Sequence, residues 1–340
     1  MVKVYYGTNR KPNRKKAPED FGTGFSDDGL ANLRFGMADI SGDELDHYDL
    51  YIAPERLNTD YQRKIKGSRG SVLGSENVFR RVREKMIEYS RDTVVFIHGY
   101  NVSFREALTS AARIKQNFST ASGGPGINVV AFSWPSDGSM MPYIAYGNDR
   151  QDAAASGPAF ARGLLKLADF LRGSTPEEAC EHRLHLVAHS MGNYVLRHTV
   201  QEYVHQSSGR PVRIFDQVFL MAADEDDDAF EHDYKLKPLT RLAKRVNVYF
   251  NNEDRAMAVS DKTKGNPDRL GDDGPRVPRG IPGKVSLIDV TPVVDGLVEH
   301  SYFIDSPRVV ADMTEVLSGK ASDAIAGREY VPETNRYRLV

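Results

Sequence analysis

Ser190 stands where a buried strand gives way to a helix. The run Leu184–Ala188 is aliphatic, as in a buried strand, and Tyr194–Val200 has helical character. A reversal this tight needs small neighbours because strand and helix nearly touch, and Ala188 and Gly192 supply them. The spacing A-x-S-x-G predicts a nucleophile elbow that holds the serine in a strained backbone conformation at the carboxyl end of a sheet. A strand–turn–helix with an idle serine would give the same local pattern.

Nucleophilic chemistry at a serine needs two further side chains. The hydroxyl is a poor nucleophile until a base removes its proton, and the base must be oriented by an acid. Acidic residues follow two of the later predicted strands, at Asp224 and Asp254, and His300 follows the last one. Because the carboxyl ends of parallel strands share one edge of a sheet, we expect these side chains near Ser190.

Alternating strands and helices must hold these residues. Apolar runs predict strands, while apolar residues at four-residue spacing, preceded by capping serines, predict helices. This alternation is typical of an α/β fold with a mostly parallel sheet covered on both faces. The predicted strands are Val2–Tyr6, Tyr48–Ala53, Thr93–Ile97, Ile127–Trp134, Leu184–Ala188, Gln217–Met221, Val246–Phe250 and Lys284–Val290. The predicted helices begin at Ser75, Ser103, near Pro158 and after Ser190. The predicted loops include the charged stretch Arg10–Asp28, Pro135–Gly147 and Asp261–Gly283.

Composition limits the classes of partner. The chain has 340 residues with 45 basic and 47 acidic side chains, a net charge of −2, so it carries no general attraction for nucleic acid or membrane surfaces. Cys180 is the only cysteine, which excludes an intrachain disulfide. Met1–Gly7 has no signal-peptide core and no apolar run approaches membrane-spanning length, so we expect a cytoplasmic protein. The oligomeric state is not indicated.

Five stretches carry a resemblance to a known family. They are Val95–Asn101 (VFIHGYN), Phe132–Ser136 (FSWPS), Leu186–Asn193 (LVAHSMGN), Asn252–Ser260 (NEDRAMAVS) and Glu299–Phe303 (EHSYF). In this order they resemble the α/β-hydrolase fold superfamily, and more narrowly a bacterial esterase/lipase-like branch first catalogued as a domain of unknown function. The stretches span about 93–303, and the first ninety residues fit the resemblance only loosely.

The resemblance implies a role for each residue at the predicted sheet edge. In that fold the chain order is nucleophile, acid and base, so Ser190, Asp254 and His300 form the implied triad. Asp224 stays the alternative acid, because some hydrolases of this fold place the acid at the end of the preceding strand. Glu253 is adjacent to the favoured acid, but its longer side chain would set the imidazole differently.

The developing oxyanion needs backbone donors. One is implied at the N–H of Met191, at the amino end of the helix, and a second in the loop of Gly99 and Tyr100. His98 and His189 flank the site in sequence, and we expect each to have a packing or hydrogen-bonding role. No cofactor is needed for this chemistry.

Apolar residues after a strand end suit the wall of a substrate pocket. Trp134 ends the predicted strand that begins at Ile127, and Met140, Met141 and Tyr143 follow it; we expect all four to contact substrate. Core packing explains the same pattern equally well.

The segment after strand 217–221 bears on the openness of the site. Only Asp224–Lys244 separates this strand from the next, room for about one helix, so we expect a small or absent cap. The acidic run Asp224–Asp228 lacks the alternating ligands and glycine of a calcium loop. It is expected to be a solvated loop and helix start, with no metal.

The sequence therefore predicts a single α/β-hydrolase domain over residues 1–320, with extra strands and loops in 1–90, a catalytic core in 91–320 and a peripheral tail in 321–340. The expected function is hydrolysis of a small-molecule carboxylic ester through an acyl-Ser190 intermediate. An amidase, thioesterase or acyltransferase could use the same triad, and a hydrolase-fold protein that binds a ligand without turnover belongs to a different class.

Overall fold

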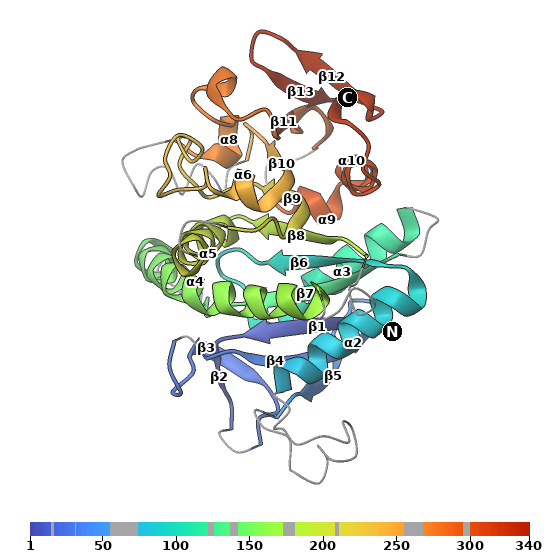
Figure 1. The fold of residues 1–340 in the computed structure, drawn as a ribbon, viewed down its shortest axis with the longest axis vertical. Helices are drawn as coiled ribbons and strands as arrows, with labels where there is room; N and C mark the ends of the chain where they lie inside the picture. Colours follow the sequence, from blue (N-terminus) through green and yellow to red (C-terminus); the bar gives the residue numbers. More distant parts are fainter. Residues whose placement is uncertain are drawn as a thin grey trace.

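One eleven-stranded sheet runs through the molecule in the order β12-β13-β11-β10-β9-β8-β6-β7-β1-β4-β5. The computed structural model describes residues 1–14, 17–30, 32–54, 74–121, 126–136, 142–172, 181–207, 211–254, 268–294 and 300–340. Figure 1 shows the sheet from the N-terminal strands at the bottom to β12 and β13 at the top. The strands are β1 Val2–Thr8, β2 Arg10–Pro12, β3 Phe21–Phe25, β4 Arg34–Ser41, β5 His47–Ile52, β6 Asp92–Ile97, β7 Ile127–Ser133, β8 Leu184–His189, β9 Phe215–Met221, β10 Ala243–Phe250, β11 Val285–Asp289, β12 Arg328–Val331 and β13 Arg336–Leu339, with β2 and β3 forming a separate pair. The α-helices are α2 Gly74–Tyr89, α3 Phe104–Ala121, α4 Pro142–Arg172, α5 Gly192–Gln206, α6 Leu239–Leu242, α8 Leu270–Asp273, α9 Tyr302–Asp305 and α10 Pro307–Leu317.

The centre of the sheet is parallel, as predicted. Neighbouring strands from β1 through β7, β6, β8, β9 and β10 to β11 pair in parallel, and β13 joins β11 in the same sense. Antiparallel pairs occur at the two flanks, between β1, β4 and β5 and between β12 and β13. Every residue of β7 and β8 is buried. Burial on both faces explains why these strands read as continuous apolar runs.

Helices cover both faces of the sheet and enclose two cores. One core includes side chains of α2, α4 and α5, and the other includes side chains of α3, α9 and α10. Val78, Val82 and Met86, predicted to face a core at four-residue spacing, are buried on α2. The predicted capping box also forms: the Ser103 N–H donates to Glu106 Oε2, and the Glu106 N–H to Ser103 Oγ.

Helix α4 differs from the prediction. It begins at Pro142, inside the segment expected to be a loop, and continues through Pro158, the residue near which the helix was expected to start. Proline favours the first turn of a helix, which makes Pro158 resemble a start. In the structure it lies in the interior, where it lacks the N–H that would bond to the carbonyl four residues earlier. Gly157 belongs to a close contact with α5: a Cβ on Gly157 would lie 2.5 Å from that of His198.

The two ends of the chain complete the sheet. Strand β4, which the sequence did not indicate, pairs with β1 along seven residues. Residues 328–339, within the segment expected as a peripheral tail, form β12 and β13 and extend the main sheet beyond β11. Arg328 is almost fully buried there, with Nε 2.6 Å from Oδ2 of Asp312 on α10. The tail is therefore part of the sheet and not peripheral. Its polar composition suggested exposure, but the charge of Arg328 is neutralised inside the protein by Asp312.

Candidate active site

The elbow after β8 has the strain that its sequence predicts. Ser190 has φ of +51°, an unusual backbone conformation for a residue with a side chain. Its N–H donates to the carbonyl of Met221 at 2.9 Å, and its carbonyl accepts from Asp224 N–H at 3.2 Å. Asn193, fully buried, donates from Nδ2 to the carbonyls of Ala188 and Ser190 at 3.1 and 3.0 Å. These bonds tie the turn to strand β9 and offset the cost of the strained serine.

Close backbone approach explains the glycines around the elbow. A Cβ on Gly192 would lie 2.5 Å from the carbonyl oxygens of Ile97 and His98, at the end of β6. A Cβ on Gly99 would lie 2.9 Å from that of Ser190. The serine and the loop after β6 are therefore in direct contact, which brings the predicted nucleophile and the predicted oxyanion loop together.

The structure pairs His300 with Asp254. Nδ1 of His300 lies 2.7 Å from Oδ2 of Asp254, whose side chain is 1% exposed, whereas the imidazole is 22% exposed. The His300 ring lies 4.6 Å from that of His189, the residue before Ser190, so the Asp–His pair lies beside the elbow. Among the described residues, Ser190 Oγ has no direct hydrogen bond to His300, as is common for catalytic pairs before substrate binds.

The alternative acid, Asp224, has other partners. It is buried, with Oδ1 3.2 Å from Nε of Arg269 and 3.9 Å from Nη1 of Arg150, and it accepts the hydroxyl hydrogen of Tyr146 at 2.5 Å. Arg269 is itself fully buried and also contacts Asp226 at 2.7 Å. These charges neutralise one another in the protein interior.

The rest of the acidic run is likewise not the solvated loop that we expected. Burial raises the pKa of Glu225 to about 7, although Arg197 Nη1 lies 3.4 Å from Oε2 and opposes this change. Lys235 Nζ lies 2.8 Å from Asp226 and also binds Asp228. Basic residues outside the run neutralise its charge, and two of them, Arg197 and Arg269, are distant in sequence, which is why the local composition suggested exposure. Within the described ranges, no group of three or more His, Cys, Asp or Glu side chains is arranged to hold a metal.

A chain of buried polar groups holds the loop of Gly99 and Tyr100, the predicted oxyanion loop. His98 Nδ1 donates to the Gly99 carbonyl at 2.9 Å, while Nε2 accepts from the Trp134 N–H at 3.2 Å and lies 3.3 Å from Ser133 Oγ. Ser133 Oγ in turn accepts from Arg10 Nε at 2.9 Å. Burial, reinforced by the nearby Arg10 charge, lowers the pKa of His98 to about 3, so the ring stays neutral.

Arg10 also belongs to this site, although no sequence pattern indicated it. Its fully buried guanidinium also donates to the carbonyls of Gly22, Val102 and Ser136. It lies in a charged N-terminal stretch that looked like a surface loop. No local pattern indicates its burial, since its acceptors come from three separate segments of the chain, at Gly22, at Val102 and at Ser133 and Ser136.

The backbone segments predicted to supply oxyanion donors both lie next to Ser190. Met191 adopts helical angles at the amino end of α5, and among the described residues its N–H has no acceptor. Gly99 and Tyr100 follow β6 beside Ser190, and the Tyr100 ring lies 5.9 Å from that of Tyr146.

Trp134 does not line a substrate wall. Its side chain is fully buried, its indole N–H donates to the His98 carbonyl at 2.9 Å, and its ring stacks on the His98 ring at 5.3 Å. It supports the oxyanion loop instead, which corrects the expected substrate contact. Met140 and Met141 lie outside the described residues; Tyr143 is in α4, and its side chain also lies outside what is described.

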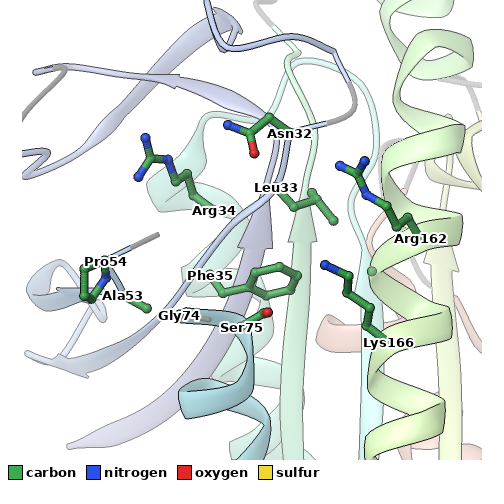
Figure 2. A pocket seen from close by; sticks show the side chains of 11 residues that line it. Asn32, Leu33, Arg34, Phe35, Ala53, Pro54, Gly74, Ser75, Arg162 and Lys166 are labelled. Atoms are coloured by element: carbon green, nitrogen blue, oxygen red, sulfur yellow. The ribbon is translucent and has the colours of Figure 1, made fainter. Parts of the chain in front are cut away.

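A separate cavity of about 270 Å³ lies between β4, α2 and α4 (Figure 2). Figure 2 shows Arg162 and Lys166 extending from α4 toward Leu33 and Phe35. None of its lining residues belongs to the Ser190 elbow, the Asp254–His300 pair or the oxyanion loop. We assign it no part in the predicted chemistry.

The sheet order and the strained elbow after β8 define an α/β hydrolase. The chain belongs to the family described as alpha/beta hydrolase of unknown function (DUF900), whose profile matches residues 76–319 and so covers every predicted triad and oxyanion residue. An uncharacterised protein of Nostoc sp. (strain PCC 7120 / SAG 25.82 / UTEX 2576) is 23% identical in an alignment that covers 72% of this chain and 77% of that protein. The family resemblance is therefore confirmed. None of the helices in the described ranges combines the length and apolar character needed to cross a bilayer.

Proposed function

We propose that this hydrolase cleaves carboxylic esters through an acyl-Ser190 intermediate. The observation that carries the proposal is the 2.7 Å contact between His300 Nδ1 and Asp254 Oδ2 beside the strained serine. A buried carboxylate at Nδ1 keeps the proton on that nitrogen and leaves Nε2 as the basic atom. This is the tautomer that a serine nucleophile requires.

The proposed reaction has two halves. His300 Nε2 takes the Ser190 hydroxyl proton as Oγ attacks the ester carbonyl, and the Met191 N–H with the loop of Gly99 and Tyr100 stabilises the oxyanion. The imidazolium, stabilised by Asp254, then gives its proton to the departing alcohol. Water, activated by the same imidazole, hydrolyses the acyl-enzyme and restores the free serine.

A fluorophosphonate probe tests this proposal directly. The probe should form an adduct at Ser190, located by mass spectrometry of the digested protein, because only an activated serine reacts with it. Ser190→Ala should lower turnover of an activated short-chain ester by up to about 10⁶-fold. Ser318→Ala, on the surface at the end of α10, is the matched control and should behave as wild type. The enzyme proposal would be contradicted if the probe did not label the wild-type protein and if its residual ester turnover were unchanged by Ser190→Ala.

We further propose that the enzyme prefers short, soluble esters. Between β9 and β10 the chain forms only the four-residue helix α6, and Phe230, Leu236 and Leu239 pack into the body of the protein, so this segment does not form a cap. Short-chain nitrophenyl esters in solution should have a kcat/KM well above that of long-chain esters. Strong activation of the enzyme by an oil–water interface would contradict this preference.

A further inference from the structure

The segment that carries His300 is attached to the sheet by its neighbours. The hydroxyl of Tyr302, fully buried, donates to the Tyr249 carbonyl at 2.9 Å and accepts from the Ala222 N–H at 2.7 Å. The Phe303 ring lies 4.8 Å from that of His189 and is also buried. These contacts fix the residues after His300 but do not touch its own backbone.

His189 makes that missing contact. Its Nε2 lies 3.0 Å from the His300 carbonyl oxygen, which can only accept, so Nε2 carries the hydrogen. On the other side of the ring, a Cβ on Gly99 would lie 3.2 Å from Nδ1, so the imidazole is held between the oxyanion loop and the base. Burial, followed by the charge of His300, lowers the pKa of His189 well below its usual value, and the ring remains a neutral donor.

The position of His189 in the chain gives this contact its meaning. It is the last residue of β8 and directly precedes Ser190, so one strand end carries the nucleophile and also holds the backbone of the base. The distance between Ser190 and the imidazole of His300 therefore depends on a bond whose donor belongs to the nucleophile's own strand.

We propose that His189 is a positioning residue, whose Nε2–H holds the His300 backbone so that the imidazole meets both Ser190 and Asp254. The proposal rests on the proposed role of His300 as the base. A misplacement of about 1 Å between reacting groups can cost on the order of 10² in rate. Loss of the bond should therefore lower kcat by about 10- to 100-fold and leave KM nearly unchanged.

Two substitutions separate this role from simple packing. His189→Gln keeps an N–H donor near the position of Nε2 but loses the ring, whereas His189→Phe keeps a ring of similar size but loses the donor. Positioning predicts that the glutamine variant retains most of the wild-type kcat and that the phenylalanine variant does not. A mere packing role predicts the reverse order, because an apolar ring suits a buried site better than an amide.

A second readout makes the test independent of turnover. The proton between His300 Nδ1 and Asp254 should give a far-downfield NMR signal, assigned by its absence in His300→Asn. We expect His189→Phe to weaken or shift this signal and His189→Gln to retain it, with thermal unfolding confirming that both variants fold. Wild-type kcat and an unchanged signal in His189→Phe would overturn the positioning role. An inactive, unlabelled wild type would instead overturn the proposed function, and the NMR comparison would still decide whether His189 holds His300.

Discussion

The two candidate acids differ in what their carboxylates neutralise. Asp254 faces the imidazole of His300, whereas Asp224 faces the guanidinium groups of Arg269 and Arg150. The first arrangement can orient a base, and the second holds buried cations in the interior. Substitutions that remove only the charge should therefore have effects of different kinds.

We expect Asp254→Asn to lower kcat by about 10⁴-fold with little change in stability, because the amide no longer fixes the tautomer of His300. Asp224→Asn should instead lower the free energy of unfolding by about 3 kcal/mol, because it leaves buried arginine charge uncompensated. Kinetics and urea unfolding of both variants distinguish these outcomes. Near-normal turnover in Asp254→Asn with a large loss in folded Asp224→Asn would reverse the assignment of the acid.

Sequence patterns predict a residue's role well when that role depends on the local shape of the backbone. They predict it poorly when the role depends on partners that are distant in sequence. Ser190 and Gly192 were found because a tight elbow restricts side-chain size at fixed spacing. Trp134 was misjudged because an apolar side chain after a strand fits a pocket wall and a buried contact equally well. Arg10 was missed because its acceptors lie in segments that only the fold brings together.

At the level of elements, the same distinction holds. Central strands such as β7 and β8 were predicted because burial on both faces demands an unbroken apolar run. Strands β4 and β13 were not, since flanking strands take much of their stability from neighbours distant in sequence. Helix α4 was placed too late because proline in a helix interior is rare, and close packing by α5 sustains it here.

The contact between α4 and α5 gives a prediction at this scale. Gly157→Ala would place a methyl group 2.5 Å from Cβ of His198 and should destabilise the fold by about 1–3 kcal/mol. Gly147→Ala, on the same helix, meets nothing within 4 Å and should be neutral or stabilise the helix by up to about 1 kcal/mol. Chemical unfolding of the pair measures the difference. Equal free energies of unfolding for the two variants would contradict the prediction, because they would show that α4 and α5 can move apart at this contact at no cost in stability.

For the whole molecule, the buried ionisable groups determine how unfolding responds to pH. Burial lowers the pKa of His98 to about 3 and of His198 to about 4, and it also lowers that of His189. On unfolding near pH 5.5 each of these rings takes up nearly one proton, whereas Glu225, with its raised pKa, releases nearly one.

We therefore expect unfolding near pH 5.5 to take up about two protons net. Since the unfolded state binds more protons, stability rises with pH in this range, by about 2.7 kcal/mol per pH unit. Calorimetric unfolding in buffers of different ionisation enthalpy measures the uptake. Glu225→Gln should increase the proton uptake by nearly one proton. A net release of protons by the wild type, or an unchanged uptake in Glu225→Gln, would contradict the assignment of these groups.

The buried guanidinium of Arg10 also bears on the order in which the chain can fold during its synthesis. Its acceptors include Gly22, Val102, Ser133 and Ser136, so a cation made among the first residues finds its last partners only after more than a hundred further residues have been added. Until β7 leaves the ribosome, burying this charge would be costly, and the N-terminal strands cannot close against the sheet. We expect the nascent N-terminal segment to stay open until then. The predicted oxyanion loop is therefore held in place only after both Arg10 and its acceptors at Ser133 and Ser136 have been translated.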